Sequence, residues 1–105
     1  MSIPQRDPRV ILAGVLIDSL VSVGRFDDAR ASIVLYPDYS NQIIALGAIA
    51  ESQGSRGRGD SARAWIAQHA PAEYRSYLYR KVNDGILAAI DRNRSSQLGA
   101  PPRNP

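Results

Sequence analysis

Residues 24–31 (GRFDDARA) recur 33 positions later as residues 57–64 (GRGDSARA). The copies differ at two positions, where an aromatic residue and an acid in the first are replaced by glycine and serine in the second. An apolar stretch precedes each copy, and a short segment that ends at a proline, Pro37 or Pro71, follows it. Self-similarity at such a period is typical of stacked supersecondary units. The repeat therefore predicts two helical hairpins.

The spacing of apolar residues around the repeat predicts an all-α fold of about five helices and no strand. The first helix is expected to begin at Asp7-Pro8, which is a good capping pair, and to end at Gly24 in a left-handed C-cap. The expected helical segments are about 8–23, 26–36, 39–53, 60–70 and 71–94. The long last segment is expected to cap the two hairpins.

Two segments carry more specific expectations. Residues 10–23 are apolar on more than one face, which predicts a central helix. Residues 54–59 (GSRGRG) hold three glycines and no apolar side chain, so we expect a linker there, with Asp60 capping the helix that follows.

At 105 residues the chain has the length of one domain, expected to cover 1–94. Residues 95–105 contain three prolines and little to bury, which predicts a disordered C-terminal tail. The apolar stretch 10–23 is interrupted by Asp18 and is shorter than the roughly 20 residues that span a bilayer. We therefore expect no membrane partner and a cytoplasmic location.

Composition and charge narrow the classes of site. The chain has no cysteine, which excludes disulfides and thiolate metal sites. Its single histidine, His69, lies near the end of an expected helix, and no Asp or Glu group has metal-ligand spacing. The net charge of +3 comes from the C-terminal half, and every cation except Lys81 is arginine. We therefore expect no enzyme activity, metal, cofactor or small-molecule substrate.

The first repeat also carries a family resemblance. Gly24, Phe26 and Ala29 stand where tetratricopeptide-like proteins have a glycine after the first helix, an aromatic residue and then a small residue. The second copy keeps Gly57 and its alanine but has glycine at the aromatic position. In these respects the chain resembles the tetratricopeptide-like helical-repeat family over about 11–79. The resemblance implies an α-solenoid-like bundle that binds proteins.

Two hairpins are fewer than the roughly three units that a stable stack needs, so an apolar side is expected to stay open. We expect a non-catalytic interaction or scaffold module that binds a protein partner or a second copy. A groove between residues 10–23 and 43–52, edged by Arg25, Arg30 and Arg63, is the expected docking place.

A second interpretation concerns residues 61–81. Two helices joined by a short turn are also typical of a helix-turn-helix nucleic-acid-binding protein. Tyr77, Arg80 and Lys81 would then face the groove or the phosphates of a duplex. We keep them as candidate partner-binding residues under either interpretation.

Overall fold

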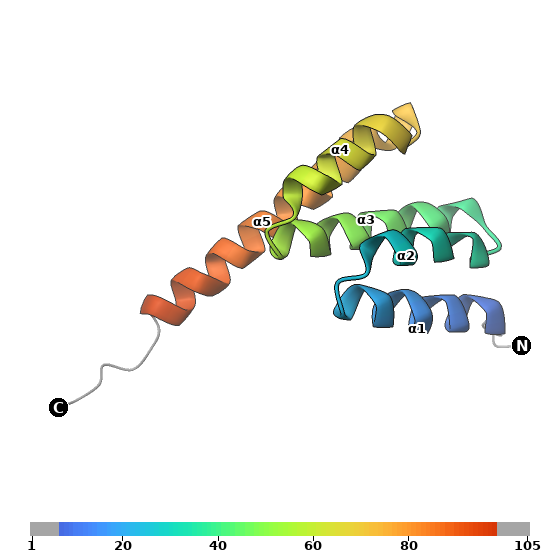
Figure 1. Ribbon diagram of the computed structural model, residues 1–105, viewed down its shortest axis with the longest axis horizontal. Helices are drawn as coiled ribbons and strands as arrows, with labels where there is room; N and C mark the ends of the chain where they lie inside the picture. The colour runs from blue at the N-terminus through green and yellow to red at the C-terminus, as the bar shows by residue number, and fades with distance from the viewer. Residues whose placement is uncertain (1–6, 99–105) are drawn as a thin grey trace, which may run out of the picture. The chain divides into compact units, whose positions relative to one another are not determined.

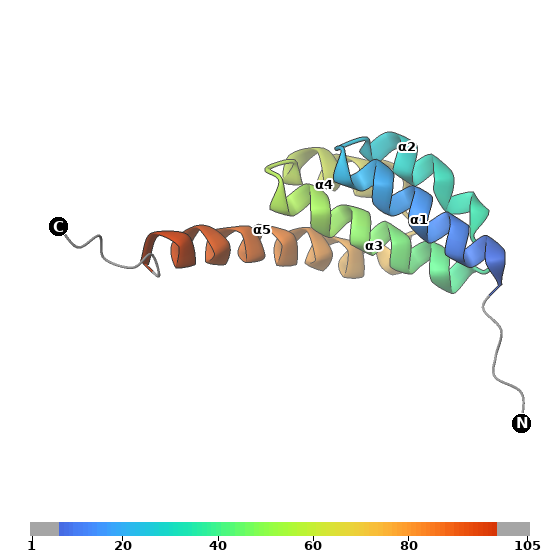
Figure 2. The ribbon, with the colours of Figure 1, turned by 90° about the horizontal axis from the view of Figure 1, so that it is seen from below.

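A computed structural model describes residues 7–98, and this part of the chain is helical with no strand (Figures 1 and 2). The elements in chain order are α1 (Pro8–Ser22), α2 (Phe26–Ala31), η1 (Ser32–Leu35), α3 (Tyr39–Ser55), α4 (Gly59–His69), η2 (Ala72–Tyr74) and α5 (Arg75–Leu98). The prediction of an all-α fold is confirmed. The chain divides into two compact units, Met1–Ile49 and Ala50–Pro105, and the boundary lies within α3.

Helix α1 begins as the sequence predicts. The carboxylate of Asp7 accepts the backbone N–H of Arg9 at 2.9 Å, and Pro8 occupies the first turn, where its missing N–H does no harm. The Arg9 guanidinium also donates to Asp7 Oδ2 at 2.9 Å. The hydrogen bond between the two side chains lowers the pKa of Asp7 and raises the pKa of Arg9.

Helix α1 ends in a Schellman motif, as the position of Gly24 predicts. Gly24 has a φ of 82° and donates its N–H to the carbonyl of Val21 at 3.0 Å. Arg25 donates its N–H to the carbonyl of Leu20 at 2.8 Å. These two bonds satisfy carbonyls that the helix leaves without a partner.

The same motif recurs at the end of α3. Gly57 has a φ of 77° and donates to the carbonyl of Gly54 at 3.3 Å, while Arg58 donates to the carbonyl of Gln53 at 2.8 Å. Each of these four residues lies 33 positions after its counterpart in the first motif. The sequence repeat is therefore also a repeat of backbone hydrogen bonding.

The predicted linker at 54–59 is largely wrong. Helix α3 continues through Gly54 to Ser55, and α4 already begins at Gly59, so only 56–58 lie outside both helices. Arg58 occupies the N-cap position without a side-chain cap bond, and Asp60 lies inside the first turn. The glycines at 54 and 59 serve helix packing, because each lies close to side chains or backbone of α5.

Other boundaries shift as well. The expected helix over 26–36 is a six-residue α-helix that tightens into the 3-10 helix η1. The expected helix over 71–94 is preceded by η2 and runs from Arg75 to Leu98. Helix therefore replaces the predicted disorder at 95–98, and the rest of the predicted tail, 99–105, lies outside the described residues.

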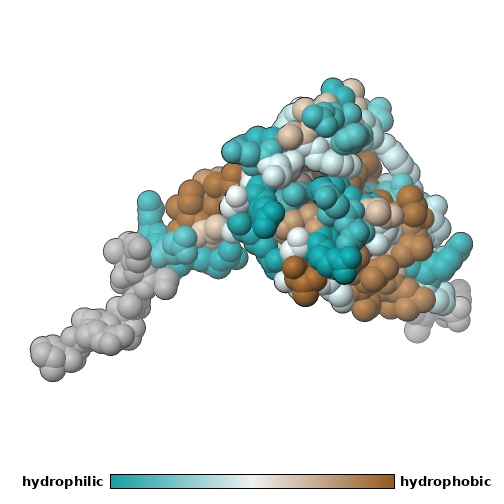
Figure 3. All heavy atoms as spheres, viewed as in Figure 1, coloured by the Kyte–Doolittle hydropathy of each residue, from teal (hydrophilic) through white to brown (hydrophobic). Residues whose placement is uncertain are grey.

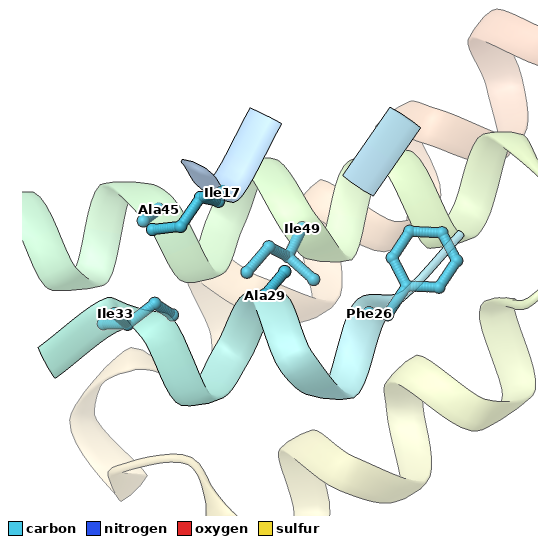
Figure 4. Close-up of a cluster of buried hydrophobic side chains, with 6 residues drawn as sticks. All are labelled: Ile17, Phe26, Ala29, Ile33, Ala45 and Ile49. Carbon is cyan, nitrogen blue, oxygen red and sulfur yellow. The ribbon is translucent and has the colours of Figure 1, made fainter. Parts of the chain in front are cut away.

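The core of unit 1 combines α1, α2, η1 and the part of α3 up to Ile49. Figure 4 shows six buried side chains from these elements pointing towards one another. They are Ile17, Phe26, Ala29, Ile33, Ala45 and Ile49. Ala29 is completely buried, and its small side chain lets α2 lie close to its neighbours.

The prediction that α1 is central is wrong. Of its residues only Ala13 and Ile17 are buried, although the helix is apolar on nearly every side. It packs against α2 and η1 through that one side. A helix that is apolar all round is central only when neighbours surround it, and unit 1 supplies neighbours for one side alone.

Unit 2 is built on an antiparallel pair of helices, α4 and α5. A Cβ at Gly59 would lie 3.1 Å from Ile86 Cδ1, whereas Arg63, one turn further along α4, bonds Asn83, earlier in α5. The residues that are completely or almost completely buried between these helices are Ala62, Ile66, Leu78 and Val82.

The end of α3 joins this pair through two glycines. A Cβ on Gly54 would lie 2.2 Å from the carbonyl oxygen of Val82, and a Cβ on Gly85 would lie 1.9 Å from that of Glu51. Real Cβ atoms do not approach so closely, so the backbones of α3 and α5 touch only because both positions are glycine.

Candidate functional site

The most distinctive surface of unit 1 is the outer side of α1, which we call the α1 face. It consists of Ile11, Leu12, Val15 and Leu16, and all four side chains are exposed. Leu12 is 68% exposed and Val15 is 60% exposed. Residues four apart on a helix share a side, so these residues form one continuous patch.

Nothing charged interrupts the α1 face. Between Arg9 and Asp18 the helix carries no charged side chain, and Figure 3 shows apolar side chains gathered over α1. Contiguous apolar patches of this kind on small proteins usually mark contact sites.

A hollow of about 230 Å³ lies next to the α1 face. It is lined by Arg9, Leu12, Ala13 and Leu35, so three of these four lining residues are apolar. An aliphatic side chain of a binding partner would fit such a hollow better than a polar ligand, because the lining offers few hydrogen-bonding groups.

A second hollow, of about 390 Å³, lies in unit 2 where α4 begins beside α5. Its lining residues include Gly57, Gly59 and Arg63 on one side of the sequence and Ile86 and Ile90 of α5 on the other. The guanidinium of Arg63 is not available as an isolated charge. It donates to Asn83 Oδ1 at 2.8 Å and lies 3.6 Å from a carboxylate oxygen of Asp60.

Two of the predicted groove-edge arginines belong to α2 and its N-cap. Arg25 donates to Asp28 Oδ2 at 2.7 Å, and Arg30 forms an ion pair with Asp27. Both pairs join residues three apart, so they stabilise α2 locally. Arg25 and Arg30 belong to unit 1 and Arg63 to unit 2, and the groove that was predicted to join them stays a prediction.

The candidate residues on α5 lie in unit 2. Lys81 Nζ is 3.5 Å from Glu51 Oε1 and 5.8 Å from the centre of the Tyr77 ring, an arrangement that fixes the ammonium group against α3. Arg80 is exposed and makes no hydrogen bond or ion pair with a described residue. Of the three, Arg80 alone presents its charge to solvent unpaired.

The single histidine of the chain packs against an aromatic neighbour on the same helix. His69 lies in the last turn of α4, and its ring centre is 5.7 Å from that of Trp65. Within residues 7–98 no three His, Asp or Glu side chains gather as a metal site would require.

Two further findings bear on identity. None of the described helices has both the length and the apolar character needed to cross a membrane. Comparison with protein-family models, with curated proteins and with solved structures finds no match for this chain.

Proposed function

We propose that this chain is a non-catalytic protein–protein interaction module whose docking surface is the α1 face. The observation that carries the proposal is the exposure of four neighbouring aliphatic side chains on a helix with no charge between Arg9 and Asp18. The tetratricopeptide-like resemblance, which implies protein binding, supports the same class of function.

The expected partner is the apolar side of an amphipathic helix. Helix α1 has 15 residues and is therefore about 22 Å long, which matches about four turns of a partner helix. One aliphatic residue of that helix would enter the hollow beside Leu12 and Leu35.

The strength of such a contact is limited by its size. Fully burying an aliphatic side chain contributes roughly 1.5–3 kcal/mol, and about half of each of the four side chains is still exposed. The face therefore offers roughly 3–6 kcal/mol, which is comparable to the lower estimates of about 4 kcal/mol for the entropy lost on association. We expect a weak or transient complex unless the partner also contacts other parts of unit 1.

The test uses one substitution on the face and a matched one off it. Val15→Glu places a carboxylate in the middle of the α1 face, and Val34→Glu makes the same change at a 76% exposed valine of η1 that does not line the hollow. A partner identified by cross-linking and mass spectrometry should lose at least tenfold in affinity for Val15→Glu and bind Val34→Glu as it binds the wild type. Equal binding of both variants would overturn the proposal.

A second measurement distinguishes the interaction module from the alternative, a helix-turn-helix nucleic-acid-binding protein. If the chain retards duplex DNA in a salt-dependent manner and Arg80→Ala weakens that binding, residues 61–81 act on nucleic acid and the interaction-module proposal is wrong.

A further inference from the structure

The hollow of about 390 Å³ in unit 2, which we call the unit 2 hollow, combines apolar side chains with exposed backbone. Ile86, Ala89 and Ile90 line it from α5. Gly57 and Gly59 line it from the turn that joins α3 and α4, and Figure 2 shows the orange-to-red part of α5 continuing beyond this turn. Nothing lies within 4 Å of a Cβ built on Gly57, so a partner can approach the backbone of the turn there.

Exposed arginines adjoin the unit 2 hollow at the turn and on α5. Arg58 lies between the two lining glycines, and Arg92 and Arg94 precede and follow Asn93, which lines the hollow from α5. On a helix these two arginines are turned by about 100° to either side of Asn93, so their long side chains flank the hollow. All three arginines are exposed, and none forms a hydrogen bond or ion pair through its side chain with another described residue. Their charges are therefore available to a partner.

Acidic side chains do not balance these charges. Asp60 is the acidic residue that lines the hollow, and one of its carboxylate oxygens lies 3.6 Å from the guanidinium of Arg63. Asp91 is two residues from Asn93, so it points to nearly the opposite side of α5. Residues 50–105 as a whole carry nine Arg or Lys against five Asp or Glu. The surroundings of the hollow therefore favour an anionic partner.

The spacing of the charges favours a stretch of peptide over a single small anion. Gly59 lies level with Ile86, because a Cβ on this glycine would be 3.1 Å from Ile86 Cδ1. Arg94 is eight residues further along α5, which is about 12 Å at the rise of a helix. One carboxylate or phosphate group cannot contact cations at both levels, whereas four extended residues span about 13 Å. The apolar residues between the two levels would hold an aliphatic side chain of that peptide.

We propose that the unit 2 hollow binds an extended acidic segment of a partner protein through one aliphatic anchor. The anchor packs against Ile86 and Ile90. Acidic residues before and after it pair with Arg58, Arg92 and Arg94. Because these arginines are exposed, binding is weak and falls as the salt concentration rises. The site lies within unit 2 and does not depend on the α1 face or on the function proposed for that face.

The test is an NMR titration of the full chain with the blocked peptide acetyl-Glu-Glu-Leu-Glu-Glu-amide, at low ionic strength because salt screens exposed charges. The backbone amide signals of Gly57 and Gly59 should shift as the peptide is added up to about 10 mM, a range that covers a millimolar dissociation constant. Replacing the leucine of the peptide by serine should raise the dissociation constant at least about threefold, because the anchor is lost. Replacing its glutamates by lysines should abolish binding, because the charges then repel.

Two pairs of variants separate this site from a general attraction to unit 2. Arg58→Glu should raise the dissociation constant at least about fivefold. Arg80→Glu makes the same change at an exposed, unpaired arginine that does not adjoin the hollow, and its affinity should stay close to that of the wild type. Ile90→Ser should make the leucine and serine peptides bind alike, whereas Leu87→Ser, outside the lining, should preserve their difference. All four side chains are exposed, so the melting temperature should change by no more than a few degrees.

Nucleic acid is the other macromolecule that exposed arginines attract, and a DNA duplex in the same titration supplies phosphates without an aliphatic anchor. A duplex that shifts the signals of Gly57 and Gly59 at lower concentration than the peptide, with the same affinity for Ile90→Ser as for the wild type, would assign the arginines to nucleic acid and overturn the proposal. So would the absence of any shift with the leucine peptide, equal weakening by Arg58→Glu and Arg80→Glu, or equal binding of the leucine and serine peptides to the wild type.

Discussion

At the scale of single residues, Gly54 and Gly85 decide how unit 2 packs. The sequence did not predict this packing role, because GSRGRG is typical of a loop and a glycine at position 85 is unfavourable inside a helix. What places these glycines inside helices is a contact between segments 31 residues apart, and no local pattern encodes such a contact. Asp7-Pro8 and Gly24, in contrast, act on their immediate neighbours, and the sequence predicted both.

We expect Gly85→Ala to destabilise the protein by at least about 2 kcal/mol, because the new Cβ would collide with the backbone carbonyl of Glu51 and push α3 and α5 apart. Urea denaturation followed by circular dichroism would measure the change. Gly14→Ala is the matched control: its Cβ would meet only the hydroxyl of Tyr36, at 3.4 Å, and the better helix propensity of alanine should add up to about 1 kcal/mol. Equal stability of the two variants would contradict the close approach.

At the scale of the elements, the two Schellman motifs explain why the sequence repeat was visible at all. Gly24 and Gly57 are the described residues with positive φ, and each ends a long helix before a short one. The sequence could predict the turns because glycine is needed there for conformation. It could not predict the tightening of α2 into η1, where Ser32 Oγ bonds the carbonyl of Asp28 at 2.9 Å.

The free energy of unfolding of variants at Gly57 should depend only on the energetic cost of the left-handed backbone conformation. Nothing lies within 4 Å of a Cβ at this position, so packing does not contribute. We expect Gly57→Ala to lower the free energy of unfolding by about 1–2 kcal/mol and Gly57→Asn to lower it less, because asparagine tolerates this conformation better. Thermal and urea unfolding of both variants would show the order, and an alanine variant as stable as the wild type would refute it.

At the scale of the whole molecule, a chain of this length makes too few helices to cover every apolar surface they create. The sequence predicted an uncovered apolar side from the number of repeats, but it assigned the wrong helix to the centre. The number of apolar residues in α1 indicates how much apolar surface this helix presents for burial. Only the packing of the other elements of unit 1 around Ala13 and Ile17 determines which side is covered.

The α1 face should be detectable without any partner. Dyes such as ANS bind exposed apolar surface, so the wild type should enhance ANS fluorescence and the double variant Leu12→Glu/Val15→Glu should enhance it several-fold less. Because both side chains are more than half exposed, the melting temperature should change by no more than a few degrees. A large loss of stability would mean that the face is part of the core.

Because Gly24 and Gly57 form the same pattern of backbone hydrogen bonds, residues 24–56 begin at one such turn and end just before the next. A gene that duplicates residues 24–56 in tandem would join each new copy through a turn the chain already uses. We expect such a lengthened protein to fold and to gain one helical hairpin with each duplication.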